Sequence, residues 1–353
     1  MPPPLPSAGY VQLNLEGGLA LNISIAVIRS CCTRPLLYLQ YVGWCILKAI
    51  GELQDSEGNA VDLDTEDIDE EMIYNYQTDT GLEHAIDPEV IRLHSSVATT
   101  KTDIRANFKQ LLSERDGNCI WTNEELPDGT HLIPFARGDE WLQRIVENRF
   151  HEGDDEEDLT DIHINDIRNG VLGSRTIHGL FDRRDVAVLK TPNPILQCHH
   201  IPAMHQRELP EGASYPQGSR YTLQWLTTGY NVTTRSRYPH NSDAAFIDHS
   251  LPKPSELILH YMYGAAMLQQ FGLGGYEELL LTRAGVPRPE PPPRVPTPPT
   301  RTVGDRSRTI AKLEQARQRQ GGGGGNNKAG RVWTARWKTQ RSLWIKNPST
   351  QKG

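Results

Sequence analysis

Three short polar motifs follow one another in residues 116–190, and they constrain the fold of this chain more than any other feature. They are Thr130-His-Leu-Ile-Pro134, Asp166-Ile-Arg-Asn-Gly170 and His178-Gly-Leu-Phe-Asp182. Residues 130–135 are short, apolar and bounded by Gly129 and Pro134, which is typical of the end of a strand. Asn169-Gly170 followed by Val-Leu predicts a turn that enters a second strand.

A short helix is expected next, with Ser174 as its N-cap and residues 175–184 as its body. His178 and Asp182 are four residues apart, so they share one face of that helix. A neutral imidazole and a carboxylate on one face can hold a divalent metal. The predicted fold class is therefore α+β, with a strand–strand–helix metal module (ββα-metal) at its centre.

The segment over about 116–202 resembles an HNH endonuclease domain of the fungal-type branch. That branch carries Ala-His-Ile-Ile-Pro, Asp-Ile-Arg-Asn-Gly and His-x-x-Phe-Asp in the same order. Gly138-Asp-Glu-Trp141 and Leu189-Lys-Thr-Pro192 resemble its flanking sequences. Each motif alone is weak, and their order makes the signal specific.

The resemblance implies a role for each polar residue. His131 corresponds to the general base that deprotonates the attacking water, and an imidazole suits this task because its unperturbed pKa lies near neutrality. Asn169 corresponds to the residue that orients the imidazole ring and ties down the loop. His178 and Asp182 correspond to ligands of one divalent metal ion, Mg²⁺ or Zn²⁺ or a similar ion. The implied substrate is DNA, with RNA as the alternative.

Two positions depart from the pattern. Many HNH nucleases carry a metal-binding Asp or His directly before the base, where this chain has Thr130. Asp128 is a candidate substitute, although an Asp in Pro-Asp-Gly is more often a turn residue. Gly173 stands where an apolar strand residue is expected.

Three functional interpretations follow. The first is a metal-dependent endonuclease that hydrolyses phosphodiester bonds. The second is a catalytically inactive module of the same fold that binds nucleic acid or a protein partner. The third is a structural module whose His and Asp hold zinc. Each polar residue taken singly is also compatible with a buried histidine, an ordinary turn or a surface pair.

The chain is expected to divide into four regions. Residues 1–87 form an N-terminal α+β region, 88–205 the nuclease module, 206–285 a flank with a helix that packs on the module, and 286–353 a Pro/Gly-rich disordered tail. Residues 10–64 should be mainly strands, with 36–50 either a buried strand pair or a helix. Residues 88–114 have helical character, and Arg105, Lys109 and Arg115 are expected on its solvated face. A second helix should start at Ser255 and run to about Phe271.

Charge is unevenly distributed. Residues 301–353 hold thirteen Lys and Arg against two acids, a net of +11, so the other residues must carry −18 to give the overall −7. Because basic residues bind phosphates and interleaved Trp side chains stack on bases, the tail is a candidate nucleic-acid contact. An equally weighted alternative is disordered sequence that binds acidic surfaces in general. Residues 151–158 are nearly all acidic and are expected to form a flexible loop directed away from substrate, with a second metal site there less favoured.

Cysteine usage and hydropathy indicate the compartment. Five cysteines without any Cys-x-x-Cys pair argue against a disulfide framework and for a reducing environment. Cys198, His199, His200 and His205 suggest zinc, but adjacent ligands fit a tetrahedral site poorly, so a surface loop is favoured. No signal peptide or membrane span is recognised. We expect an intracellular protein, nuclear or cytoplasmic, and leave its oligomeric state open.

Overall fold

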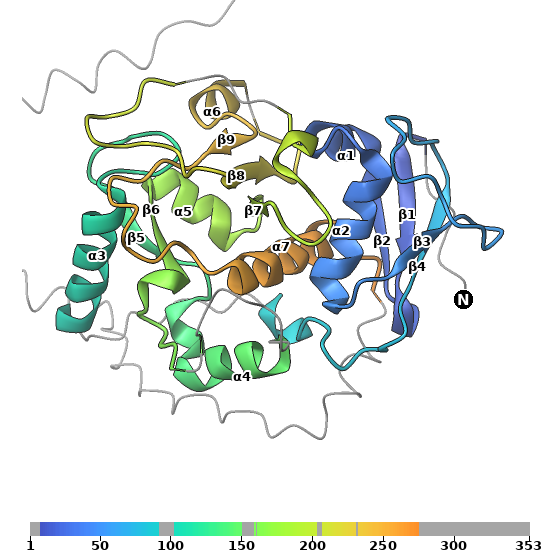
Figure 1. Ribbon diagram of the computed structural model, residues 1–353, viewed down its shortest axis with the longest axis horizontal. Helices are drawn as coiled ribbons and strands as arrows, with labels where there is room; N and C mark the ends of the chain where they lie inside the picture. The colour runs from blue at the N-terminus through green and yellow to red at the C-terminus, as the bar shows by residue number, and fades with distance from the viewer. Residues whose placement is uncertain are drawn as a thin grey trace, which may run out of the picture. The chain divides into compact units, whose positions relative to one another are not determined.

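The computed structural model describes residues 8–91, 102–149, 159, 161–202, 207–230 and 232–274, without the side chains of 102–106. All of them belong to one compact unit, Met1–Pro289. The fold is mixed α+β, which confirms the predicted class (Figure 1). The predicted boundaries near residues 87 and 205 stay predictions. No helix of the described residues is long and apolar enough to span a bilayer.

The N-terminal region contains a four-stranded mixed sheet in the order β2-β1-β4-β3. Its strands are β1 (Tyr10–Asn14), β2 (Ala20–Ser24), β3 (Glu52–Gln54) and β4 (Ile73–Gln77). β1 pairs with β2 antiparallel and with β4 parallel. Val11 and Leu13 of β1 point to one face of the sheet and are fully buried, and Gln12 between them is buried as well because β1 lies inside the sheet, between β2 and β4.

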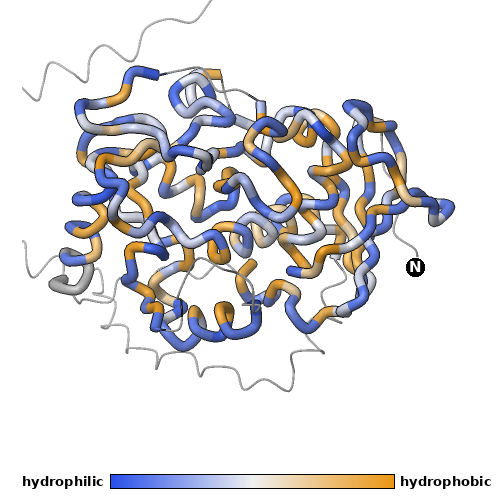
Figure 2. The backbone as a smooth tube through the Cα atoms, in the orientation of Figure 1, coloured by the Kyte–Doolittle hydropathy of each residue, from blue (hydrophilic) through white to orange (hydrophobic). Residues whose placement is uncertain are grey.

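Helices interrupt the region that was expected to be mainly strands. They are α1 (Ile25–Cys31) and α2 (Pro35–Leu47). The apolar run at residues 36–50 is thus chiefly a helix, which resolves the alternative left open by its hydropathy. Pro35 starts α2, where its missing N–H costs nothing. Nearly all residues of α2 are buried because α1, α7 and β3 pack against it, and apolar residues recur along its whole length (Figure 2).

Helix α7 (Glu256–Phe271) packs between the N-terminal region and the rest of the unit. Ser255 caps it by accepting a hydrogen bond from the Ile258 amide, which confirms the predicted helix start. α7 packs against α2 and against strand β7 (Val186–Thr191). β7 belongs to a three-stranded antiparallel sheet with β8 (Arg220–Trp225) and β9 (Ser242–Asp243). Beyond α7, Leu273 donates its amide hydrogen to the Ala20 carbonyl at the edge of the first sheet.

The remaining helices and strands are α3 (Thr102–Asp116), β5 (Asp128–His131), α4 (Asp139–Arg149), β6 (Gly170–Gly173), α5 (Arg175–Asp182) and α6 (Val232–Arg237). They include a two-stranded hairpin, β5–β6, which contacts α3 and α5. α4 lies in the long segment between the two strands and begins directly after Gly138. Figure 1 shows α3 and α5 on either side of the β5–β6 hairpin.

Candidate active site

The first two motifs pair as neighbouring strands. β5 and β6 run antiparallel, with Thr130 opposite Val171 and His131 opposite Gly170. The third motif lies on α5, which begins two residues after β6 because the Ser174 hydroxyl accepts a hydrogen bond from the Ile177 amide. The predicted order of strand, strand and helix is therefore present.

The hairpin presents different residues on its two faces. Asp128 and Thr130 face α5: the Asp128 carboxylate approaches side chains of α5, and a Cβ at Gly173 would meet the Thr130 hydroxyl at 3.2 Å. Gly129 and His131 face α3, since alternate strand residues point to opposite faces. A Cβ at Gly129 would lie 3.5 Å from Leu112 of α3. Gly173 is small because the Thr130 side chain occupies the space in front of it.

On the α3 face, His131 lies in an aromatic and amide environment. Its ring stacks on Phe108 with 4.0 Å between ring centroids and 12° between ring planes. Phe135 is tilted against the same ring at 5.7 Å. The Nε2 atom of His131 lies 3.1 Å from Oδ1 of Asn165. Because an amide oxygen accepts, this contact is a hydrogen bond in the tautomer that carries its proton on Nε2.

Asn169 is fully buried and fastens the loop that follows His131. Its Oδ1 accepts from the Ile133 amide at 2.8 Å, and its Nδ2 donates to the carbonyls of Ile133 and Ile164 at 3.1 and 2.8 Å. The two tasks expected of Asn169 are thus divided between two residues. Asn169 ties down the loop, and Asn165, four residues earlier, contacts the ring. The sequence motif pointed to the first amide and missed the second.

On the α5 face, His178 lies between two carboxylates. Its Nδ1 is 4.0 Å from Oδ2 of Asp128, and its Nε2 is 3.9 Å from Oδ1 of Asp182. Arg175, whose side chain is 92% exposed, lies 3.6 Å from the same Asp128 oxygen. Asp128 is a strand residue of β5 and not a turn residue, so it belongs to this cluster. The described contacts join His178 with Asp182 and Asp128, and they do not join it with His131.

The donor atoms of this cluster set a limit on the metal it can hold. Among residues described in the structure, no group of three or more His, Cys, Asp or Glu side chains is placed to hold a metal ion. The two carboxylates approach opposite nitrogens of one ring, whereas an imidazole binds one ion through one nitrogen. His178 with one carboxylate therefore offers two protein ligands to one ion. An imidazole suits zinc and other transition metals, whereas a site completed by several waters suits Mg²⁺, so either ion fits this donor set.

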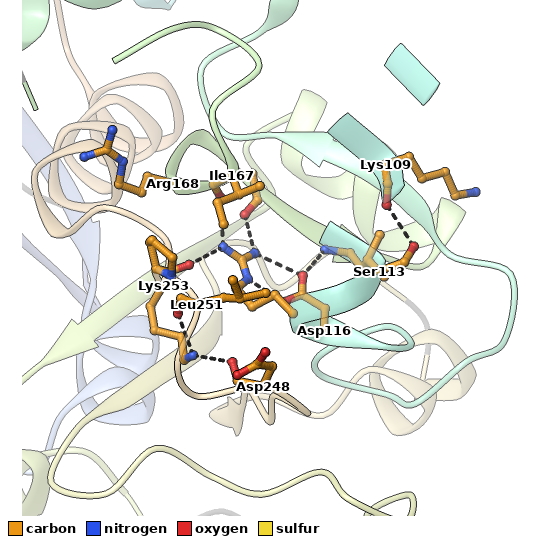
Figure 3. A network of polar contacts seen from close by, with 12 residues as sticks. Lys109, Ser113, Asp116, Ile167, Arg168, Asp248, Leu251 and Lys253 are labelled. Atoms are coloured by element: carbon orange, nitrogen blue, oxygen red, sulfur yellow. Dashed lines mark hydrogen bonds and ion pairs between the residues drawn. The ribbon is translucent and has the colours of Figure 1, made fainter. Parts of the chain in front are cut away.

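A buried ion pair holds the hairpin against α3 (Figure 3). Arg115 and Asp116 form a two-point contact, with Nε–Oδ1 at 2.6 Å and Nη2–Oδ2 at 3.0 Å, and both side chains are buried. Arg115 also donates to the carbonyls of Ile167 and Gly170, while Asp116 accepts from the Leu172 amide. Arg115 was expected on a solvated helix face, and this prediction is wrong. Its guanidinium reaches carbonyl groups that only the folded chain brings together.

The Asp166-Ile-Arg-Asn-Gly motif has a local structural reason. Asp166 caps the 3-10 turn Ile167–Asn169 and forms an ion pair with Arg168 at 2.7 Å. Burial would raise the pKa of Asp166, but its hydrogen bonds with Arg168 outweigh burial and lower the pKa below its usual value. The charged carboxylate therefore fixes the turn that leads Asn169 into β6.

Several predictions concern residues outside those described. They are the acidic run 151–158, His205, the side chain of Arg105 and the basic tail 301–353. Of the Cys198 cluster, His200 caps its own turn by accepting from the Gln197 amide at 3.0 Å. This contact accounts for one histidine of the cluster without a metal.

The comparison with known families agrees with this geometry. Residues 117–189 match a family described as HNH endonuclease. No curated protein and no solved structure matches the chain. The match spans β5, α4, β6, α5 and part of β7, and it includes all four predicted site residues. Between residues 117 and 189, this chain therefore carries an HNH endonuclease domain.

Proposed function

We propose that the protein is a metal-dependent HNH-type endonuclease that hydrolyses phosphodiester bonds in DNA. The observation that carries the proposal is the β5–β6–α5 unit itself. It places an oriented imidazole at the end of the first strand and a His/Asp pair on one face of the helix, within the segment that matches the family.

His131 acts as the general base. Asn165 accepts from Nε2–H, so Nδ1 takes the proton from the attacking water. The stacked Phe108 ring fixes the plane of the imidazole, and Asn169 fixes the backbone just after it. These contacts leave little freedom in the position of the base relative to its strand.

His178 and Asp182, which lie one helical turn apart on one face of α5, would hold the divalent ion, Mg²⁺ or Zn²⁺ or a similar ion. A bound ion would supply Lewis-acid stabilisation of the negative charge that develops as the phosphodiester bond breaks. Asp128 contributes from the opposite side of the His178 ring. Its carboxylate lies 4.0 Å from Nδ1, on the side of the ring opposite Asp182, which is where carboxylates behind metal-binding histidines lie.

The two halves of the site lie on opposite faces of the hairpin, so one phosphate can meet both only at the hairpin's edge or end. His131 is the last residue of β5, which puts the base at such an end. If the faces cannot share a phosphate, the fold would bind nucleic acid without cutting it. This is the second candidate function.

Cleavage of supercoiled plasmid separates the two functions. Purified protein is incubated with plasmid and Mg²⁺, Mn²⁺, Ca²⁺ or Zn²⁺, beside a chelated sample and the His131→Ala variant. The proposal expects nicking that needs metal and is abolished in the variant. Retarded plasmid without nicking under every metal would favour the binding module. A parallel reaction with structured RNA decides between the two nucleic acids.

A further inference from the structure

Phe108 contacts the predicted base from outside the recognised domain. It belongs to α3, nine residues before the segment that matches the HNH family begins. Its side chain is buried with 3% exposure, and its ring lies nearly parallel to that of His131. With Leu112 and Leu172 it forms a small hydrophobic cluster that is separate from the main core. The cluster therefore fastens α3 to the face of the hairpin that carries His131.

Gly170 makes room for this ring. A Cβ on Gly170 would lie 2.3 Å from Cζ and 2.9 Å from Cε2 of Phe108. The backbone of Gly170 is extended, with φ −157° and ψ 166°, a conformation that any residue adopts. Position 170 is therefore a glycine because any side chain there would collide with the Phe108 ring, and not because its backbone conformation needs one. Gly170 is also the partner of His131 in the strand pairing, so one position serves both the pairing and the aromatic contact.

We infer that Phe108 is a positioning residue for His131, so that the catalytic unit extends upstream of the HNH domain to α3. The inference rests on the proposed function. An imidazole on a strand can rotate about both of its side-chain torsions. Asn165 restrains one ring nitrogen, and the flat contact with Phe108 restrains the ring plane. Together they fix the direction in which Nδ1 points, which is what a general base requires.

The test compares two substitutions in the same helix and the same cluster. Phe108→Leu keeps an apolar side chain but removes the flat ring. Leu112→Ala, one turn further along, also removes buried volume from the cluster but leaves the ring in place. Leu112→Ala is therefore the control for loosened packing of α3. Gly170→Ala is a third variant, which displaces the Phe108 ring without deleting it.

The first readout does not depend on cleavage. The carbon-bound ring protons of His131 are followed by NMR in histidine-labelled protein and assigned with His131→Gln. Stacking on Phe108 predicts upfield ring-current shifts in the wild type and in Leu112→Ala. Both Phe108→Leu and Gly170→Ala should lack them.

The second readout is the plasmid cleavage rate with saturating Mg²⁺ and saturating DNA. A misplacement of about 1 Å can reduce a rate about 10²-fold, so we expect kcat to fall by about that factor in Phe108→Leu, with DNA and metal affinity unchanged. Leu112→Ala should retain its rate below its melting temperature. Equal rates in Phe108→Leu and Leu112→Ala, or unshifted ring protons in the wild type, would overturn the inference. A wild type that shows the shifts but never cuts DNA would refute the proposed function and leave the aromatic contact established.

Discussion

The carboxylate of Asp128 lies 4.0 Å from Nδ1 of His178, on the face of the hairpin that carries the helix and not the base. Thr130 points to the same face, two residues further along β5. It occupies the position where many HNH nucleases carry a metal-binding Asp or His. The chain thus has a carboxylate on the correct side of β5, two residues before the position where the family pattern places a ligand. In the proposed site Asp128 therefore stands behind the His178 ring, on the side opposite Asp182.

Substitution of Asp128 should weaken metal binding to a degree that depends on the replacement. Asp128→Ala removes the carboxylate behind His178, and the affinity for Mg²⁺ or Mn²⁺ should fall about 10- to 100-fold. Asp128→Asn keeps an oxygen of the same shape at this place and loses only the charge, so its affinity should fall less. Isothermal titration of the metal measures both. An equal and complete loss of metal binding in the two variants would make Asp128 a direct ligand.

His178→Ala and Asp182→Ala should impair metal binding before any other property of the protein. Each removes one of the two ligands proposed for the ion, so the apparent affinity should fall, and cleavage with it. A large excess of Mg²⁺ should partly restore cleavage, because the ion keeps its water ligands and its phosphate ligand. Cleavage rates are measured over a wide range of metal concentration. Variants with wild-type metal dependence would show that the ion binds elsewhere.

Asn169 and Asn165 should differ in their effects on stability. Asn169→Ala leaves one buried amide hydrogen and two carbonyls without their partner, at a cost of about 3–5 kcal/mol. Asn165→Ala removes the acceptor of the imidazole Nε2–H and should cost about 1 kcal/mol, while it slows cleavage. Urea denaturation and plasmid nicking are run on both variants. If Asn165→Ala proves as destabilising as Asn169→Ala, the division of tasks between them is wrong.

Acid should destabilise the fold through His240. Its Nδ1 accepts from the Trp225 amide and its Nε2 donates to the Ser30 carbonyl, so only the neutral ring satisfies both contacts. Burial lowers the pKa of His240 to about 4. The unfolded chain takes up the proton below its ordinary pKa of about 6.5. Above about pH 6.5 His240 is neutral in both states and does not lower the free energy of unfolding. As the pH falls from there toward 4, protonation of the unfolded chain lowers the free energy of unfolding by about 3 kcal/mol in all.

The measurement is the free energy of unfolding in urea from about neutral pH down to about pH 4. His240→Gln should be less stable at neutral pH and should show a shallower decline on acidification. Buried His260, whose pKa burial also lowers, contributes to the curve of both proteins, so the difference between the two curves isolates His240. Parallel curves would contradict the assignment.

Local signals predicted the site's framework, whereas its supporting contacts escaped prediction. The caps at Ser174 and Ser255 and the His178/Asp182 spacing are readable because they depend on neighbours within a turn of helix. The contacts of Arg115 and Phe108 depend on groups tens of residues away, so their sequence looks like an ordinary amphipathic helix. Gly170 carried a readable hint, since a glycine inside a strand often marks a close approach of another group.

The run at residues 36–50 shows a limit of a different kind. An apolar segment without polar interruptions has no period, so its hydropathy fits a buried helix as well as buried strands. Its tertiary neighbours decide between helix and strand, and here α7 packs against the segment as helix α2 in the core. Asn165 was overlooked for a similar reason. It lies in a loop, where no periodicity distinguishes a ring contact from a solvated amide.

The basic tail should supply affinity and not chemistry. Removing residues 301–353 takes away thirteen basic side chains. Every phosphate that these side chains neutralise contributes about 0.9 to the steepness of log affinity against log salt, so the shortened protein should give a flatter plot. The cleavage rate at saturating DNA should not change. DNA binding is measured by fluorescence anisotropy over a series of salt concentrations. An unchanged slope in the shortened protein would exclude the tail from the interface.

The central claim is that His131 moves the proton while His178 and Asp182 hold the ion. The most direct measurement is the single-turnover cleavage rate of His131→Ala at a Mg²⁺ concentration that saturates it, with metal binding titrated on the same preparation. The account predicts metal affinity equal to that of the wild type and a rate lower by about 10²- to 10⁴-fold, the range expected when a general base is removed. A variant that cuts at the wild-type rate, or whose metal affinity falls as severely as that of His178→Ala, would contradict it.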